Sequence, residues 1–119
     1  MTNSAAALEV AQAYHQAWTS HDLDQAMTYV ADDISCDAPG GRINGAERYR
    51  AFLGGFMARL TGVETIAGFG DDRTAVLFYY PHTAQVDDAP TAEWFTVTSG
   101  KIIRSVLVFD RLSFSPPQS

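Results

Sequence analysis

Apolar residues in the first part of the chain recur at the three- and four-residue spacing of a helix. One face of the first predicted helix, which ends near residue 19 or 20, carries Leu8, Ala11, His15 and Trp18. A second helix is predicted from Leu23 to Val30, with Ser20 or Asp22 as its cap. The tight connection between them predicts a helical hairpin.

A polar break at residues 31–33 and a short extended run at 34–37 follow these helices. Pro39 and the two glycines after it predict a sharp reversal of the chain. Asn44 is the expected cap of a third helix, with Glu47 in the capping-box position. The core face of this helix carries Tyr49, Phe52, Leu53, Phe56, Met57 and Leu60.

Alternation replaces the helical spacing in the second half of the chain. Segments rich in β-branched and aromatic residues predict four antiparallel strands, at 63–69, 74–80, 92–98 and 101–110. Ser99 and Gly100 fit a two-residue hairpin turn, and the longer loop at 83–90 is expected to overhang a cavity mouth. Helices followed by a curved sheet predict an α+β fold in one domain, residues 1–119, with a loose tail after about residue 114.

Charge and composition narrow the expected partners. A net charge of -6 and an isoelectric point near 4.7 argue against nucleic acid and against anionic membrane surfaces. Cys36 is the only cysteine, so no internal disulfide is expected. The first residues lack the basic flank of a signal peptide, and no apolar run is long enough to span a membrane. We therefore expect a cytoplasmic protein.

Histidines and glycines do not form a recognisable cofactor motif. His15, His21 and His82 are scattered, without the pairing that a built-in metal site requires. The glycines lack the spacing of a phosphate-binding loop. We expect neither a metal nor another cofactor.

Glu93 is a carboxylate within an apolar strand. Period-two alternation places it on the same face as Phe95 and Val97, so it faces the interior if they do. Burial would raise the pKa of Glu93 and allow it to stay protonated near neutral pH. The alternative is a solvated Glu93 at the start of its strand, or one paired with Arg104 across the hairpin.

The order of helix, acidic break, strand with an acid near Pro39, turn and helix resembles the nuclear-transport-factor-2-like superfamily. That superfamily includes ketosteroid isomerases, SnoaL-type polyketide cyclases and limonene epoxide hydrolases. The resemblance implies a conical, cystatin-like roll, with three N-terminal helices packed on a curved, mostly antiparallel sheet. It also implies a homodimer formed through the outer face of the sheet.

Segments 10–14, 21–24, 31–33, 37–39 and 93–102 resemble bacterial ketosteroid isomerases more closely. By position, the resemblance makes Tyr14 and Glu93 the pair that holds the enolate oxygen. The position of the proton-shuttling base falls on Ala38, and Asp37 lies one residue early. A one-residue shift points a strand side chain to the opposite face unless a bulge restores it. Asp37 is therefore an uncertain base, and steroid isomerisation is in doubt.

Other members of the superfamily leave further alternatives. Epoxide hydrolysis is disfavoured, because Thr91 stands where the relay needs an arginine, although Asp110 matches the last acid of that relay. SnoaL-type cyclases need only one acid or base in an apolar pocket, for which Glu93 and Asp110 are candidates. Tyr14 and His15 are the candidate hydrogen-bonding partners. The expected pocket lining is His15, Trp18, Phe52, Phe56, Phe78, Phe95 and Phe109.

Three functions follow from these observations. We favour a cofactor-free acid/base isomerase, cyclase or lyase acting on a small apolar carbonyl compound, with Glu93, Tyr14 and either Asp37 or Asp110 in the site. A non-catalytic pocket that binds a small apolar ligand is the first alternative. The second is an interaction module that pairs through the outer sheet face, where Trp94 and Thr96 would project.

Overall fold

A computed structural model of the chain describes residues 6–84 and 89–109. Its elements follow in the order α1 (Ala6–Thr19), α2 (Leu23–Met27), β1 (Val30–Ala38), β2 (Gly41–Asn44), α3 (Ala46–Met57), β3 (Leu60–Gly70), β4 (Thr74–Thr83), β5 (Thr91–Thr98) and β6 (Lys101–Val108). The strands form one curved sheet in the order β2-β1-β6-β5-β4-β3. All neighbours pair antiparallel except β1 and β6, which are parallel.

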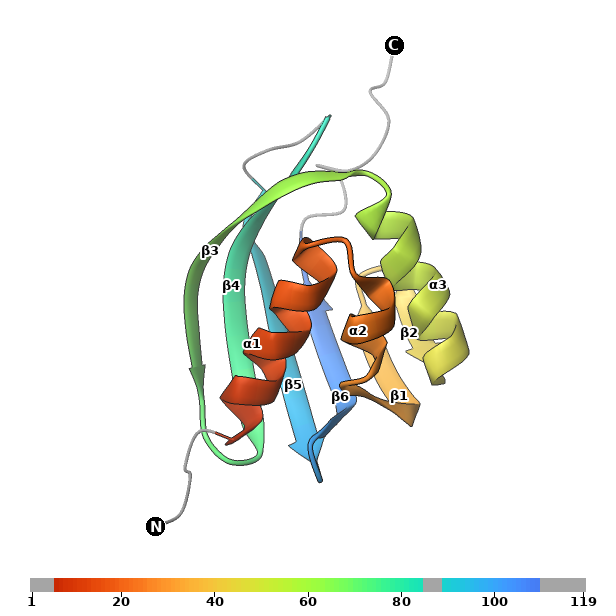
Figure 1. Ribbon diagram of the computed structural model, residues 1–119, viewed down its shortest axis with the longest axis vertical. Coiled ribbons are helices and arrows are strands. Elements are labelled where there is room, and N and C mark those ends of the chain that lie inside the picture. The colour runs from red at the N-terminus through yellow and green to blue at the C-terminus, as the bar shows by residue number, and fades with distance from the viewer. Residues whose placement is uncertain (1–5, 85–88, 110–119) are drawn as a thin grey trace.

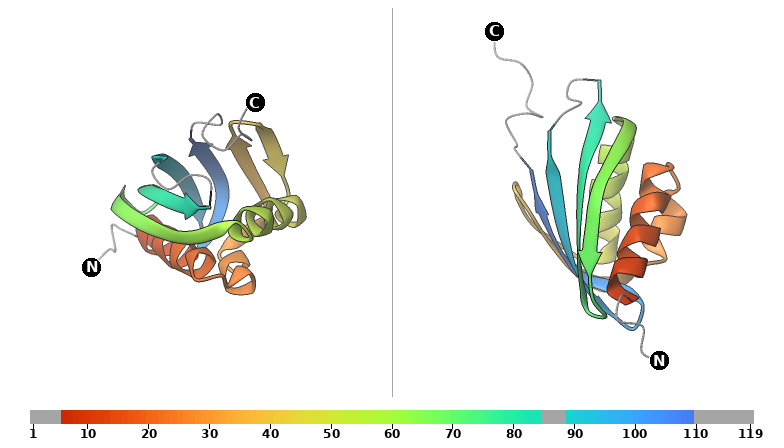
Figure 2. Two further views of the ribbon diagram at one scale, coloured as in Figure 1. Left: turned by 90° about the horizontal axis from the view of Figure 1, so that it is seen from above. Right: turned by 90° about the vertical axis from the view of Figure 1, so that its left-hand side faces the viewer.

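The three helices cover one face of this sheet and leave the other face open (Figures 1 and 2). The sheet curls around α1, as the view from above in Figure 2 shows. The helices contribute Ala11, Tyr14, Trp18, Tyr49 and Leu53 to the core between helices and sheet. The predicted α+β architecture, with helices on a curved and mostly antiparallel sheet, is confirmed.

The helical hairpin forms as expected, but its second helix is shorter than predicted. The Asp22 carboxylate caps α2 by accepting a hydrogen bond from the Gln25 amide at 3.1 Å. The helix ends at Met27, and the predicted polar break at residues 31–33 lies inside β1. Val30 pairs with Ile102 on β6, so the backbone is extended from Val30 onward. Pairing with a strand distant in sequence therefore overrides the local helical pattern.

A short strand occupies part of the predicted turn. Gly41 allows the reversal with a φ of 138°, and β2 then pairs back onto β1. Asn44 ends this strand and does not cap α3, contrary to prediction. Gly45 is the N-cap residue, with a φ of 91° and its amide donating to the Ile34 carbonyl at 2.8 Å. The β pairing takes Asn44 away from the helix start.

The predicted antiparallel meander is confirmed as β3 to β6, although β3 begins three residues earlier than expected. Leu60, assigned to the third helix by its spacing, begins β3. Ser99 and Gly100 make the predicted two-residue turn, with φ values of 52° and 77°. Positive φ at both positions suits the right-handed twist of the two flanking strands.

Candidate functional site

A cavity of about 320 Å³ lies on the helix side of the sheet, between α1, α3 and strands β4 to β6. Its volume is at the lower end of the range for small-molecule sites. Aromatic and aliphatic side chains make most of its wall. It is lined by Tyr14, Trp18, Tyr49, Ala51, Phe52, Leu53, Gly55, Phe56, Arg59, Tyr79, Pro81, Thr83, Thr91, Glu93, Leu107 and Phe109.

Glu93 is the carboxylate in this wall. Thr91, Glu93, Phe95 and Val97 are buried in alternation along β5, so Glu93 faces the interior as its spacing predicted. Its side chain is only 4% exposed. One carboxylate oxygen accepts a hydrogen bond from the Tyr79 hydroxyl and the other from the Ser105 hydroxyl, each at 3.1 Å.

Burial raises the pKa of Glu93 to about 7, while hydrogen bonds from Ser105, Tyr79 and Tyr49 act in the opposite direction. All three partners are neutral donors, so they compensate the lost hydration only in part. The carboxyl therefore changes its protonation state near neutral pH. The alternative pairing of Glu93 with Arg104 is wrong, because Arg104 points to the other face and binds Asp37.

Two tyrosines extend the network from α1 and α3. The hydroxyls of Tyr14 and Tyr49 are buried and hydrogen-bonded to each other. Burial raises the pKa of both tyrosines well above the usual value, so both stay protonated as donors. Tyr14 is thus connected to Glu93 through Tyr49. The two sequence-predicted residues, Tyr14 and Glu93, line the same cavity.

Sequence reasoning missed three members of this network: Tyr49, Tyr79 and Ser105. Tyr49 was assigned to the core face of its helix. Tyr79 lies two residues after buried Leu77 on β4, and this alternation marks it as inward-facing. Ser105 is a fully buried hydroxyl among apolar strand residues, and a buried hydroxyl needs a partner. The alternation around Tyr79 was available in the sequence, whereas the burial of Ser105 is known from the structure, and neither identified Glu93 as the shared partner.

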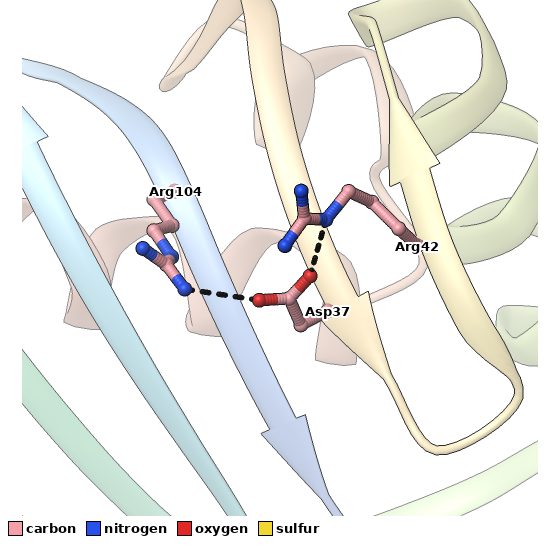
Figure 3. Close-up of polar contacts among 3 residues, drawn as sticks. All are labelled: Asp37, Arg42 and Arg104. Carbon is pink, nitrogen blue, oxygen red and sulfur yellow. Dashed lines mark hydrogen bonds and ion pairs between the residues drawn. The ribbon is translucent and has the colours of Figure 1, made fainter.

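Asp37 lies on the opposite face of the sheet, outside the cavity, so its predicted place as a base in the pocket is wrong (Figure 3). Ile34 and Cys36 take the inward positions of β1, and Asp37 therefore points outward. Its carboxylate binds Arg42 at 2.7 Å and Arg104 at 3.0 Å. These hydrogen bonds, that from Arg42 first, lower the pKa of Asp37.

Of the seven residues expected to line a pocket, four aromatic residues lie in the wall of this cavity and three do not. Trp18, Phe52, Phe56 and Phe109 line the cavity. Phe78 is 42% exposed on the outer face, because Leu77 and Tyr79 take the inward positions of β4. Phe95 is fully buried behind the wall, where its ring packs edge-on against Tyr14. Asp110 lies outside the described residues.

His15 lies beside the cavity, not in its wall. Its Nε2 is 3.1 Å from the Thr65 hydroxyl, and its ring packs between Trp18 and Tyr79. The imidazole borders a separate groove between α1 and β3. Burial lowers the pKa of His15 to about 4, so this side chain is neutral at physiological pH.

Within residues 6–84 and 89–109, no three His, Cys, Asp or Glu side chains come together as a metal site would require. No helix in the same part of the chain is sufficiently long and apolar to cross a membrane.

Comparisons with known proteins agree with this geometry. The model of the SnoaL-like domain matches residues 11–105. A solved protein from Kribbella flavida DSM 17836 is 48% identical, with a TM-score of 0.91 over 93% of this chain and 92% of that one. No curated protein matches the chain.

Two more distant solved structures share the fold. A candidate ketosteroid isomerase from Kribbella flavida DSM 17836 is 16% identical, with a TM-score of 0.82 over 100% of this chain and 87% of that one. An NTF2-like protein from Cytophaga hutchinsonii ATCC 33406 is 15% identical, with a TM-score of 0.75 over 90% and 93% of the two chains. The predicted resemblance to the nuclear-transport-factor-2-like superfamily is confirmed.

Proposed function

We propose, from the premise that this chain belongs to the SnoaL-like domain family, that its cavity binds a small, largely apolar carbonyl compound. Within the cavity, Glu93 catalyses a cofactor-free proton transfer on that compound, in an isomerisation, cyclisation or elimination. The observation that carries this proposal is a buried carboxyl with a pKa of about 7 in an aromatic cavity. A catalytic acid or base works best when its pKa is close to the operating pH.

The proposed step begins with ionised Glu93. Its carboxylate takes a proton from the carbon next to the carbonyl, and the electron pair of that C–H bond forms the C=C bond of an enolate. The carbonyl π electrons move to oxygen. Once Glu93 has taken up the proton, the Tyr49 hydroxyl turns from that carboxyl to the enolate oxygen as its donor, while Tyr14 donates to Tyr49. Protonated Glu93 then returns the proton to carbon. Asp110 stays a predicted second acid or base.

Exchange of protons with solvent tests this proposal. We expect the protein to accelerate deuterium incorporation next to the carbonyl of an apolar cyclic ketone such as 2-tetralone, followed by proton NMR in deuterium oxide. The rate should rise with pH through about 7, as Glu93 ionises, and then level off. Glu93→Gln should lower the rate by about 10²- to 10⁴-fold, the usual contribution of such a group.

Asp37→Asn is the matched control, because Asp37 lies on the far face and should leave the exchange rate unchanged. An unchanged rate in Glu93→Gln, or a loss in both variants, would contradict the assignment to Glu93. Binding of the ketone without exchange would favour the alternative function, a non-catalytic pocket. That alternative is favoured by the absence of a second carboxylate among the described residues that line the cavity.

We also propose that two copies of this chain pair through the outer face of the sheet. That face exposes Phe69, Phe78 and Val108, which are 64%, 42% and 59% exposed. The Asp37 carboxylate on this face is paired within the chain with Arg42 and Arg104, so this carboxylate adds little repulsion between two copies. Exposed apolar surface of this kind marks an interaction site.

Sedimentation velocity tests the pairing. We expect a dimer for the unmodified protein, and a monomer for Phe78→Ser, which places a hydroxyl on the apolar face. Arg48→Gln, an exposed change on α3, is the control and should stay dimeric. A monomer at all concentrations of the unmodified protein would contradict this proposal.

A further inference from the structure

We infer that the ligand of this cavity carries an anionic group, most simply a carboxylate, at the end remote from its carbonyl, and that Arg59 binds this group. The inference rests on the proposed function, because it places the carbonyl end of the ligand at Glu93. It narrows the class of substrate from a neutral ketone to a small, otherwise apolar keto acid.

Arg59 is the only cationic side chain in the cavity wall that the structure describes. Its guanidinium makes no ion pair with any described residue, whereas Arg42, Arg50 and Arg104 all bind aspartates. The planar guanidinium of an exposed arginine in a cavity wall presents a set of donors that matches the two oxygens of a carboxylate.

Arg59 and Glu93 lie at opposite ends of the cavity. Arg59 follows α3 and precedes Leu60, which pairs with Thr83 at the end of β4. Glu93 pairs with Leu77, six residues earlier on β4, which corresponds to about 20 Å along a strand. Arg59 is exposed, and Glu93 is buried. The cavity therefore has a cation at its mouth and the hydrogen-bonding network of Glu93 and the tyrosines at its base.

The wall between these ends has little to bind a charge. Trp18, Phe52 and Phe56 form its helix side, and Tyr79 and Pro81 its strand side. A ligand that fills the cavity thus meets an apolar middle. Glu93 and the tyrosine hydroxyls lie at one end of it, and Arg59 lies at the other. Its carbonyl or enolate oxygen would lie near the tyrosine hydroxyls, and its carboxylate would lie toward solvent at Arg59.

Isothermal titration with two acids of different length tests this inference. The probes are para-hydroxybenzoate and para-coumarate, each compared with its methyl ester, because the hydroxyl imitates an enolate and the ester removes only the charge. We expect the unmodified protein to bind at least one acid about five-fold more tightly than its ester, the scale of a partly exposed ion pair. The preference should fall as salt is raised.

Arg59→Gln should remove the preference for the acid and leave ester binding unchanged, which also shows that the variant is folded. Arg59→Lys should keep part of the preference. Arg48→Gln, on α3 and outside the cavity wall, should keep all of it. Equal binding of acid and ester at both lengths, no binding of either, or an unchanged preference in Arg59→Gln would overturn the inference.

The two proposals fail separately. If Glu93→Gln leaves proton exchange unchanged while Arg59→Gln abolishes the acid preference, the acid/base function is wrong and the anionic ligand stands. If Glu93→Gln abolishes exchange while acid and ester bind equally, the acid/base function stands and the role of Arg59 is wrong.

Discussion

Glu93 and Asp37 are carboxylates of the same sheet that face opposite sides, and their pKa values move in opposite directions. Burial raises the pKa of Glu93 to about 7 on the inner face. Hydrogen bonds from Arg42 and Arg104 lower the pKa of Asp37 on the outer face. Both carboxylates have partners on β6, where Ser105 binds Glu93 and the adjacent Arg104 binds Asp37.

The difference between the two faces lies in the charge of the donors. Asp37 receives charged donors and remains partly hydrated, so its ionised form is favoured. Glu93 receives only neutral hydroxyl donors and is almost completely buried, so its neutral form is favoured up to about pH 7. Two adjacent residues of β6 thus have different roles. Arg104 holds Asp37 in an ion pair on the outer face, and Ser105 donates to a carboxyl suited to proton transfer on the inner face.

Core packing gives the largest expected contrast between the faces. Phe95→Ala should lower the free energy of unfolding by about 3–5 kcal/mol, because Phe95 is completely buried against Tyr14. Phe69→Ala on the outer face should change it by less than about 0.5 kcal/mol, because Phe69 is 64% exposed. Urea unfolding at low protein concentration measures both. Equal losses in the two variants would mean that the outer face is also covered.

The pH dependence of stability gives the next largest effect. The folded pKa of Glu93 lies above its unfolded value of 4.5, so its stabilising contribution is complete below pH 4.5 and is lost as the pH rises to about 7. Glu93→Gln should remove this loss and gain about 3 kcal/mol at pH 8 relative to the unmodified protein. Urea unfolding at pH 5 and pH 8 measures the difference.

Asp37→Asn is the corresponding change on the outer face, and its effect on the free energy of unfolding has the opposite sign. The lowered pKa of Asp37 contributes stability above the ordinary carboxyl range, and this contribution disappears as the pH falls through the folded pKa. The variant should therefore be less stable than the unmodified protein at neutral pH. A gain in stability at pH 8 in Asp37→Asn would remove the distinction between the faces.

His15, on α1, is a buried group whose pKa is lowered, in contrast to that of buried Glu93. Its folded pKa of about 4 lies below the unfolded value of 6.5, so its neutral form stabilises the protein above pH 6.5 and the stability falls as the pH drops toward 4. His15→Gln should remove about 2 kcal/mol of this acid-induced loss. Unfolding at pH 7 and pH 4.5 measures it, with His21→Gln, a change of an exposed histidine, as the control. If His15→Gln lost as much stability between pH 7 and pH 4.5 as the unmodified protein, a group other than His15 would cause the acid-induced loss.

The outer ion pairs should have the smallest effect. Arg104→Gln breaks one contact to Asp37 and the contact of the guanidinium with the Trp94 ring at 6.0 Å. Because these side chains are largely solvated, we expect a small decrease in melting temperature at low salt that disappears in about 1 M sodium chloride. A decrease of the same size at high salt would show that packing, and not charge, holds this contact.

Local patterns predicted most of the fold and one end of the site. Period-two alternation placed Glu93 inward, and the turn chemistry of Ser99 and Gly100 fixed the last hairpin. The network around Glu93 was not predictable in the same way. It depends on which strand residues lie opposite one another, and Ser105 and Tyr79 reach Glu93 from two different neighbouring strands.

Errors in the prediction share a physical cause. The end of α2 depends on the pairing of β1 with the distant strand β6, and the strand β2 and the cap of α3 depend on the pairing of β1 with β2. Local propensity for a helix, a turn and a cap at these places is weaker than the hydrogen bonds of the sheet. Asp37 was uncertain for a related reason, since a single-residue change of register decides its face.

The parallel pairing of β1 with β6 has a consequence for how the chain acquires its structure. Ser35 lies opposite Arg104, and Cys36 lies opposite Ser105, so this contact closes a long loop of chain. Contacts between distant segments form slowly, because their loop entropy must be overcome first. On a ribosome, the helices and the first strands emerge well before β6. The carboxyl of Glu93 gains its Ser105 partner only when β6 has emerged, so the site is completed after the helices and the strands that precede β6.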